Sequence, residues 1–331
     1  MDNTKKIIGN RILIIQLGGI GDVLLSFPAL RLLKKNSKEI CLLGLERGLN
    51  LVQAYFPEFK LIKFPFDPFR YNLTNMIQFF NLLAKVKEIE ADSVVNLQPI
   101  TSLKASLPIF SIMKSSGAKV MVGRNTGGRG WFLSHKISEE LGEGKFEGEY
   151  GLELAELATG RNQQCRNFSV DLNEEMLKKT ARYEFPENMK VGICMGGKLP
   201  EQRWGDEKYH VVINRIMDAT DYNVMLIGER TENDLYEFPN KRIWDYRGKT
   251  DNVSDLIALI SKVDVFISND TGPMHIACAL KKKVIALFRE YTFPRFSWKS
   301  DNIFNLVAAK VDDIPVDEVW QKLLGLICEK K

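Results

Sequence analysis

The stretch RILIIQLGGIGDVLLSFPALRLLKK, residues 11–35, decides the fold. Its first seven residues are almost continuously apolar and rich in isoleucine, which predicts a short strand buried on both faces. The glycines of residues 18–21 follow as a tight turn, and residues 23–35 carry apolar side chains at helical spacing, with Asp22 at the predicted N-cap position. Pro28 lies inside this helix and should kink or restart it. A strand, a glycine turn and a helix in this order open a doubly wound α/β domain.

The same alternation of strands and helices runs through the chain twice. Before residue 185 the sequence predicts further elements at residues 39–45, 76–89, 92–97, 120–122 and 148–159. After residue 186 the scheme begins again, with elements at residues 190–195, 209–220, 223–227, 255–262, 263–268, 273–280, 284–288 and 316–328. The pattern weakens around residues 173–188, where Pro186 marks a predicted linker. We therefore expect two Rossmann-like lobes, residues 1–185 and 186–331, facing a cleft.

Length and composition fit two globular lobes. The 331 residues are too many for one ordinary hydrophobic core, and 45% hydrophobic with 27% charged residues is typical of a globular protein. The apolar runs are strand-sized and the first ten residues are polar, so neither a membrane-spanning helix nor a secretory signal is predicted. A cytoplasmic protein is expected. Five scattered cysteines without a CxxC pair predict buried thiols instead of a disulfide framework or a zinc site.

Positive charge is concentrated in one part of the first lobe. Residues 94–138 contain no acidic residue, and their basic residues are Lys104, Lys114, Lys119, Arg124, Arg129 and Lys136. Such a stretch attracts anions, although chance clustering on a solvated face gives the same pattern. Lys104, Arg124 and Arg129 are our candidates for binding an anionic partner. The sequence has no nucleic-acid motif and no aromatic interleaving here, so DNA and RNA are not expected as partners.

The stretch VDVFISNDTGPMHIACAL, residues 263–280, is the most specific motif of the chain. A buried strand leads to Thr271 and Gly272, and a helix begins near a proline, which the first helical turn favours. The N–H groups and the positive dipole end of that helix form a site for a diphosphate. His275 adds a possible donor, and Asp270 a possible acceptor for sugar hydroxyls. An ordinary α/β turn, in which Asp270 and Thr271 only cap the helix, explains the motif equally well.

The glycine turn of the first lobe is the second candidate. Gly19 and Gly21 allow a ligand to approach the backbone closely. Asp22, at the carboxyl edge of the sheet, can act as a general base on a hydroxyl nucleophile. A capping aspartate without chemistry is the alternative. The turn is not the dinucleotide fingerprint, because Leu24 stands where a glycine or alanine is needed.

A third glycine turn precedes a pair of cations. Residues 196–204 read GGKLPEQRW, in which Lys198 and Arg203 are suited to a phosphate and the tryptophan is expected to pack against the next helix. The sequence contains no Walker A, HExxH or GxSxG motif and no Asp-x-Asp pair. Bound phosphates would therefore be held by helix ends and cations, with no metal and no other cofactor.

Together these stretches resemble the ADP-heptose:lipopolysaccharide heptosyltransferase family, glycosyltransferase family 9. The resemblance runs over most of the chain, in the order ILIIQLGGIGDVLLSFPAL, a glycine turn before RW, RGKT, and ISNDTGPMHIACAL. It implies a GT-B fold in which residues 1–185 bind the acceptor and residues 186–331 bind the nucleotide sugar. The last helix of such a fold is expected to pack back on the first lobe.

The resemblance also implies a reaction. It is an inverting, metal-independent transfer of a sugar, expected to be heptose from ADP-heptose, to an anionic lipopolysaccharide-core acceptor at or near the inner membrane surface. Asp22 is the implied base, and Glu229 is our choice for the ribose-binding acid, with Glu232 second. The donor-binding set is Lys198, Arg203, Glu229, Asp270, Thr271, Gly272 and His275; the acceptor-binding set is Gly19, Gly21, Lys104, Arg124 and Arg129.

The chain departs from the family pattern at two positions. Gln202 stands where the family commonly has lysine, and Arg289 where it usually has glycine. Both lie where nucleotide and sugar would bind. Two other functions therefore stay open: a sugar-nucleotide-binding homologue without catalysis, and an NAD-dependent oxidoreductase, which explains the fold but not the DTGPMH motif.

Overall fold

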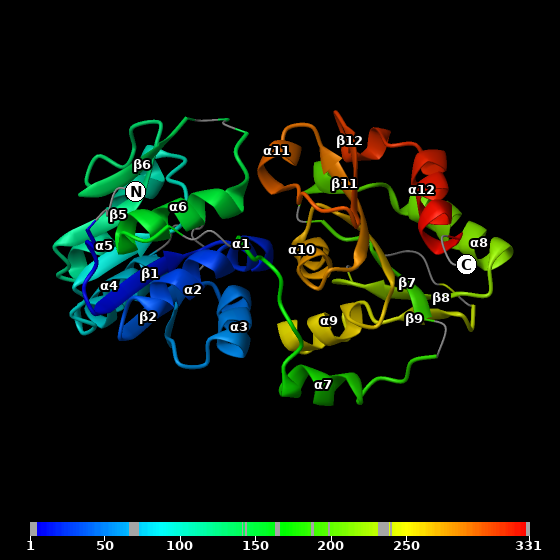
Figure 1. Cartoon of the computed structure of the whole chain (residues 1–331), viewed down its shortest axis with the longest axis horizontal. Coiled ribbons are helices and arrows are strands. Elements are labelled where there is room, and N and C mark those ends of the chain that lie inside the picture. Colours follow the sequence, from blue (N-terminus) through cyan, green and yellow to red (C-terminus); the bar gives the residue numbers. More distant parts are fainter. Residues whose placement is uncertain are drawn as a thin grey trace. The chain divides into compact units, whose positions relative to one another are not determined.

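The chain folds into two compact units, Met1–Phe168 and Ser169–Lys331. The computed structural model describes residues 5–65, 73–140, 142, 144–162, 166–186, 189–197, 199–230, 238 and 240–328. Each unit is built around a parallel sheet of six strands with helices on its faces (Figure 1). The predicted pair of α/β domains is thus confirmed.

The sheet of the first unit has the strand order β3-β2-β1-β4-β5-β6. Its strands are β1 (Arg11–Gln16), β2 (Glu39–Gly44), β3 (Lys60–Lys63), β4 (Ser93–Asn96), β5 (Val120–Thr126) and β6 (His135–Glu139). β1 pairs in parallel with β2 and with β4, and residues 12–16 are all buried, as the unbroken apolar pattern predicts. The strand order reverses between β1 and β4, which is where ligands bind in such sheets.

Helices cover both faces of this sheet. They are α1 (Ile20–Leu25), α2 (Phe27–Lys35), α3 (Glu46–Tyr55), α4 (Leu73–Lys87), α5 (Leu103–Ser115) and α6 (Glu147–Thr159). Because side chains alternate along a strand, Leu13 and Ile15 face one layer, where they form a core with Val86 of α4 and Ile112 of α5. On the other face α2 packs against α6 (Figure 1).

The helix after β1 differs from its prediction at its start. Gly19, in an extended conformation, is the N-cap of α1, and Asp22 is the third residue of the helix. The predicted N-cap position of Asp22 is therefore wrong, because the glycine turn is shorter than expected and the helix begins at Ile20. The effect of proline is confirmed: α1 ends at Leu25, and α2 restarts with Pro28 as its second residue.

The second unit repeats the same topology in the order β12-β11-β10-β7-β8-β9. Its strands are β7 (Met189–Cys194), β8 (Asn223–Ile227), β9 (Ile243–Asp245), β10 (Val265–Asn269), β11 (Lys283–Arg289) and β12 (Ile303–Ala308). Its helices are α7 (Glu174–Thr180), α8 (Asp206–Ala219), α9 (Val253–Ile260), α10 (Gly272–Ala279), α11 (Phe293–Phe296) and α12 (Val316–Cys328). The order reverses between β7 and β10, so these two neighbouring strands frame the ligand position.

The first and last helices of the second unit are α7 and α12. α7 lies in the stretch interpreted from sequence as a linker, and it packs against α9. The boundary between the compact units therefore lies between residues 168 and 169 of the chain, earlier than the 185/186 boundary chosen from sequence. α12 packs on the core of the second unit through Val319, Leu323 and Leu326. No helix in the described part of either unit is both long and apolar enough to cross a bilayer.

Candidate functional site

The most specific motif starts α10 at the carboxyl end of β10. Thr271 is the N-cap and Gly272 the first helical residue, while the Thr271 hydroxyl lies 3.1 Å from Ser268 Oγ. In the structure as described, no side chain caps the first N–H groups of this helix. Those N–H groups and the positive end of the helix dipole are suited to an anion. Helix start, cap and proline agree with the sequence prediction.

His275 lies in the first turn of α10 with one defined tautomer. Its side chain is buried, and the indole Nε1 of Trp298 lies 2.8 Å from its Nδ1. Because an indole N–H can only donate, Nδ1 accepts, and the ring proton sits on Nε2. Nε2 lies 3.5 Å from Oδ1 of Asp270, which is also largely buried. The structure therefore brings together His275 and Asp270, and it adds Trp298, which sequence reasoning missed.

Asn269 ties this helix start to the glycine turn after β7. The side chain is fully buried and accepts hydrogen bonds from the Tyr209 hydroxyl (2.9 Å) and the Trp204 N–H (3.2 Å). It donates to the carbonyls of Met195 and Gly196, at 3.2 and 2.9 Å. Both turns of the candidate site are thus held by one amide. Sequence reasoning missed Asn269; the signal that could have indicated it is an amide residue directly after an apolar strand.

Of the two cations expected beside the glycine turn after β7, the structure describes Arg203. Lys198 lies outside the described residues. Arg203 is exposed, and its Nε donates to the Gly197 carbonyl at 2.9 Å. Gln202, in place of the family's lysine, accepts from the Leu199 N–H at 3.3 Å and so closes a single 3-10 turn.

Arg289 brings a cation to the same 3-10 turn from the end of β11. A guanidinium nitrogen lies 3.8 Å from a carboxylate oxygen of Glu201, and the side chain is 21% exposed. Its Nε is buried and has no hydrogen-bond partner among the described residues. A buried donor without a partner is costly, and a bound anion would satisfy it.

Glu229 follows β8, the next strand of the sheet, and is exposed, whereas Glu232 lies outside the described residues. The adjacent Gly228 has φ +122°, and its carbonyl accepts from the N–H of Gly248 at 2.8 Å. Gly248 belongs to the RGKT motif, whose Arg247 is buried and paired with Asp245 at 2.8 Å. This motif therefore supports the loop that carries Glu229.

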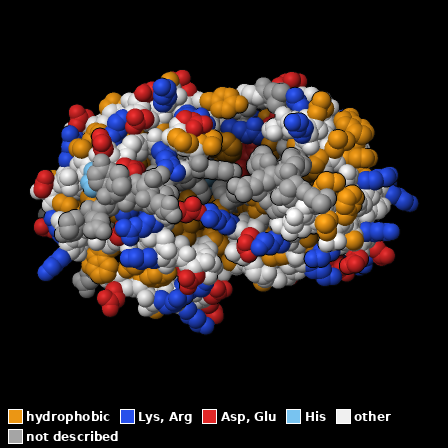
Figure 2. All heavy atoms as spheres, turned by 180° about the vertical axis from the view of Figure 1, so that it is seen from behind, with side chains coloured by type: hydrophobic (Ala, Val, Ile, Leu, Met, Phe, Trp, Pro, Cys, Tyr) orange, Lys and Arg blue, Asp and Glu red, His pale blue; other side chains and the backbone are white. Residues whose placement is uncertain are grey.

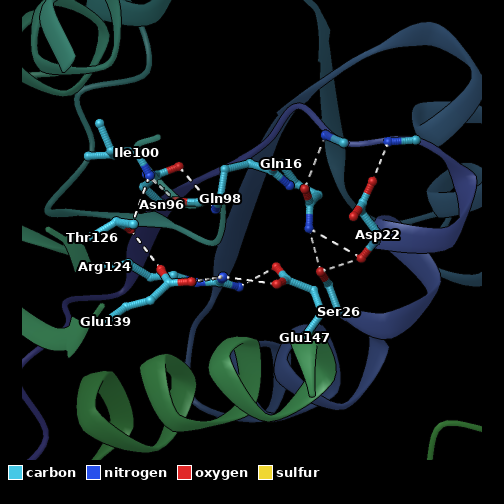
Figure 3. Close-up of polar contacts among 12 residues, drawn as sticks. Gln16, Asp22, Ser26, Asn96, Gln98, Ile100, Arg124, Thr126, Glu139 and Glu147 are labelled. Atoms are coloured by element: carbon cyan, nitrogen blue, oxygen red, sulfur yellow. Dashed lines mark hydrogen bonds and ion pairs between the residues drawn. The ribbon is translucent and has the colours of Figure 1, made fainter. Parts of the chain in front are cut away.

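In the first unit, Asp22 is fixed by the glycine turn (Figure 3). Its Oδ2 accepts from the N–H of Gly19 at 2.8 Å. A Cβ added to Gly18 would lie 2.4 Å from the Asp22 Cβ, so only glycine fits there. Gln16 is buried beneath the turn, where its Oε1 accepts from the Gly18 N–H (3.2 Å) and its amide donates to Ser26. Gly21 is buried in α1.

The three cations chosen from the acid-free stretch differ in their surroundings. Arg124 is 1% exposed, lies between Glu139 and Glu147 (Figure 3), and stacks on the Tyr150 ring at 4.4 Å. Its positive charge is thus paired with two buried carboxylates inside the first unit. Lys104 is exposed on α5, and Arg129 is partly buried with one nitrogen donating to the Thr126 carbonyl at 3.3 Å.

Cysteine side chains lie in the cores of both units. Cys41, Cys194 and Cys278 are free and buried, as the sequence predicts, and burial raises the pKa of the Cys41 thiol to about 11. Among the residues whose positions are described, no group of three or more His, Cys, Asp or Glu side chains is placed to hold a metal.

Comparison with protein families gives one match over most of the chain. The sequence model of glycosyltransferase family 9 (heptosyltransferase) matches residues 79–311. The lipopolysaccharide heptosyltransferase 2 of Escherichia coli K12 is 27% identical over 111 residues, which cover 31% of this chain and 31% of that protein. The matched segment thus spans about a third of that curated relative's length.

Comparison with solved structures extends the likeness to the whole fold. A glycosyl transferase family 9 structure from Veillonella parvula DSM 2008 superposes with a TM-score of 0.78 at 19% identity, covering 99% of this chain and 100% of that one. E. coli ADP-heptose lps heptosyltransferase II gives a TM-score of 0.76 at 18% identity, over 96% and 99% of the two chains. At these identities the likeness shows a shared GT-B fold.

Proposed function

The chain belongs to glycosyltransferase family 9, the heptosyltransferases, and on that premise we propose that it transfers a sugar from a nucleotide diphosphate to a hydroxyl of an anionic glycolipid. The proposed donor is ADP-heptose, after which the E. coli heptosyltransferase II of the same fold is named. The proposed acceptor is of the lipopolysaccharide-core type, presented at the cytoplasmic side of the inner membrane.

The observation that carries this proposal is the uncapped start of α10 beside the turn after β7. The first-turn N–H groups, Gly272 and the glycine turn offer a diphosphate a set of backbone donors joined through Asn269. His275 offers a proton on Nε2, and Asp270 beside it offers an acceptor for sugar hydroxyls. Glu229, from the adjacent strand, is the proposed ribose ligand.

Arg289 supplies a positive charge in place of the lysine that the family commonly has at the position of Gln202. Its guanidinium reaches the 3-10 turn that contains Gln202, and its Nε is buried without a partner among the described residues. We assign it, together with Arg203 and Lys198, to the donor's diphosphate. The two departures from the family pattern then compensate each other in charge.

The proposed reaction is a single displacement with inversion. Asp22 accepts the proton of the acceptor hydroxyl while that oxygen forms a bond to the anomeric carbon. The bond from this carbon to the diphosphate oxygen breaks, and the electron pair leaves with the nucleoside diphosphate. Negative charge then grows beside the α10 start and Arg289, where preorganised dipoles and charge stabilise it. Lys104 and Arg129, near the carboxyl edge of the first sheet, are proposed to bind the anionic acceptor, with Gly19 and Gly21 allowing its close approach.

Nucleotide binding tests this proposal without an acceptor. Calorimetric titration with ADP, UDP, GDP and NAD⁺, with and without Mg²⁺, should give binding of ADP that does not depend on the metal. A preference for UDP or GDP would change the proposed donor. Binding of NAD⁺ alone would overturn the transferase in favour of an oxidoreductase.

A further inference from the structure

Two neighbouring helices of the first unit expose an unusual amount of apolar surface. Met76, Ile77 and Phe80 of α4 are 55%, 58% and 64% exposed, and Leu103 and Leu107 of α5 are 71% and 62% exposed. Each helix buries its other face in the core beneath the sheet, and the two helices pack against each other. Contiguous exposed apolar surface of this kind marks an interaction site more often than single residues do.

The apolar residues follow the helix geometry into one face on each helix. In α5, Leu103, Leu107 and Phe110 are spaced four and three residues apart, so they share one side. Trp131, 58% exposed, lies with its ring 5.3 Å from the ring of Phe110 and extends this side. We call this set of exposed apolar residues the apolar face: Met76, Ile77, Phe80, Leu103, Leu107 and Trp131.

The charged residues within the two helices of the apolar face are all basic, although exposed Glu88 and Glu90 follow directly after α4. Neither α4 nor α5 contains an acidic residue, and their basic residues Lys85, Lys87, Lys104 and Lys114 are all exposed. In Figure 2, hydrophobic side chains lie beside Lys and Arg side chains on the part of the surface that belongs to the first unit, where Asp and Glu side chains are also visible. Lys104 lies in the first turn of α5 beside the exposed apolar residues, and the other three lysines lie in the last turns of the two helices. Two copies of this pair of helices would bring like charges together. An anionic partner is attracted to them.

We propose that the apolar face docks the protein on an anionic lipid bilayer. Leucine, phenylalanine and tryptophan side chains at the ends of two helices can enter the headgroup region, while the lysines bind lipid phosphates. A membrane surface is favoured over a protein groove because the face combines several separate apolar side chains with two helices that contain lysines and no acidic residue.

The position of the apolar face in the first unit fits a lipid-linked acceptor, and this part of the inference rests on the proposed function. α4 and α5 follow β3 and β4, so their first turns lie at the carboxyl edge of the first sheet, the same edge as Asp22. The exposed apolar residues of both helices lie in their N-terminal halves. A docked protein would hold this edge near the bilayer, where the headgroup of a lipid-linked acceptor is found.

Vesicle flotation of the full chain tests the docking. We expect binding to phosphatidylcholine vesicles that contain about a third phosphatidylglycerol, weak binding to phosphatidylcholine alone, and loss of binding in about 0.5 M NaCl. The double variant Leu103→Gln/Leu107→Gln should lower the partition coefficient about tenfold or more, since glutamine keeps the helix but not the apolar contact. Lys85→Gln/Lys87→Gln/Lys114→Gln should lower it for anionic vesicles only.

A matched control uses exposed apolar residues elsewhere. Leu177→Gln/Val211→Gln removes side chains that are 53% and 41% exposed on α7 and α8, and it should leave vesicle binding unchanged. Equal loss in this control, equal binding to neutral vesicles, or no flotation of the parent would overturn the proposal. A dimer that Leu103→Gln/Leu107→Gln converts to a monomer would assign the face to a second copy instead.

Failure of the docking proposal can be distinguished from failure of the proposed transferase function. The Leu103→Gln/Leu107→Gln variant should bind ADP like the parent and should act normally on a lipid-free acceptor. A parent that floats with anionic vesicles but fails to bind any nucleotide would leave the docking face standing and refute the transferase.

Discussion

The indole Nε1 of Trp298 donates a hydrogen bond to His275 Nδ1 at 2.8 Å, and this single contact decides which nitrogen of the histidine can donate to a ligand. Protonation of Nδ1 would require the bond to break. His275 therefore enters the proposed donor site with its Nε2 proton fixed beside Asp270. Trp298, from the segment after β11, thereby fixes the orientation of the His275 ring.

Trp298→Phe keeps an aromatic ring and removes this donor. We expect ADP affinity to fall about threefold to tenfold, the size of one lost hydrogen bond. The imidazole ¹⁵N signals of His275 should change from the Nε2–H pattern to a mixture of tautomers. Phe296→Leu, which removes a ring contact to His275 and leaves the hydrogen bond from Trp298 in place, serves as the control. An unchanged tautomer pattern in Trp298→Phe would remove the positioning role.

Arg289→Gln tests the replacement of the family's lysine. Loss of this cation should weaken ADP binding about tenfold or more, because charge-assisted hydrogen bonds to phosphate contribute more than neutral ones. Adenosine binding should change little, since it lacks the diphosphate. If ADP and adenosine lose affinity equally, Arg289 acts through the structure of the turn instead. Gln202→Lys in the Arg289→Gln background should then fail to restore affinity, whereas the phosphate role predicts restoration.

Arg124 is expected to matter for folding. Arg124→Met leaves Glu139 and Glu147 buried without their cation, which should lower the free energy of unfolding by about 3–5 kcal/mol. Lys104→Met, on the exposed surface of α5, should change it by less than about 0.5 kcal/mol. Urea unfolding followed by circular dichroism measures both. Similar values for the two variants would contradict the internal role of Arg124.

Asp245 predicts a pH dependence of stability. Burial alone would raise the pKa of its carboxyl, but hydrogen bonds from Arg247 outweigh burial and lower the pKa. A lowered folded pKa stabilises the protein above the unfolded value of about 3.9, and this contribution is lost as the pH falls through the folded pKa. Asp245→Asn should therefore lower the Tm at pH 7 and differ less from the parent below about pH 4. A constant difference in Tm would refute this.

The sequence predicted the parts of the fold that depend on unbroken apolar strands and glycine turns. β1, β8 and β10, and the start of α10, agree closely with their predictions because each has a continuous core pattern or a clear cap. α5 was not predicted, since Pro108 and several serines interrupt its helical pattern. α7 is only seven residues long and takes its stability from α9, which a local pattern does not reveal.

The candidate site was predictable where one motif carries several residues. Asp270, Thr271, Gly272 and His275 are close in sequence, so the strand and helix of that motif were enough to bring them together. Arg124 shows the limit: the acid-free stretch made it a candidate for binding an anionic acceptor, but its partners Glu139 and Glu147 lie farther along the sequence and enclose it. Trp298 and Arg289 meet the site only through the tertiary fold.

The most direct measurement of the central claim is sugar transfer itself, from ADP-heptose to a lipopolysaccharide-core acceptor in the presence of a metal chelator. The parent should form product with inverted anomeric configuration, and Asp22→Asn should bind ADP normally while its turnover falls by about 10²-fold or more. Turnover of Asp22→Asn within about threefold of the parent, where general base catalysis contributes far more, would contradict the assignment of Asp22 as the base.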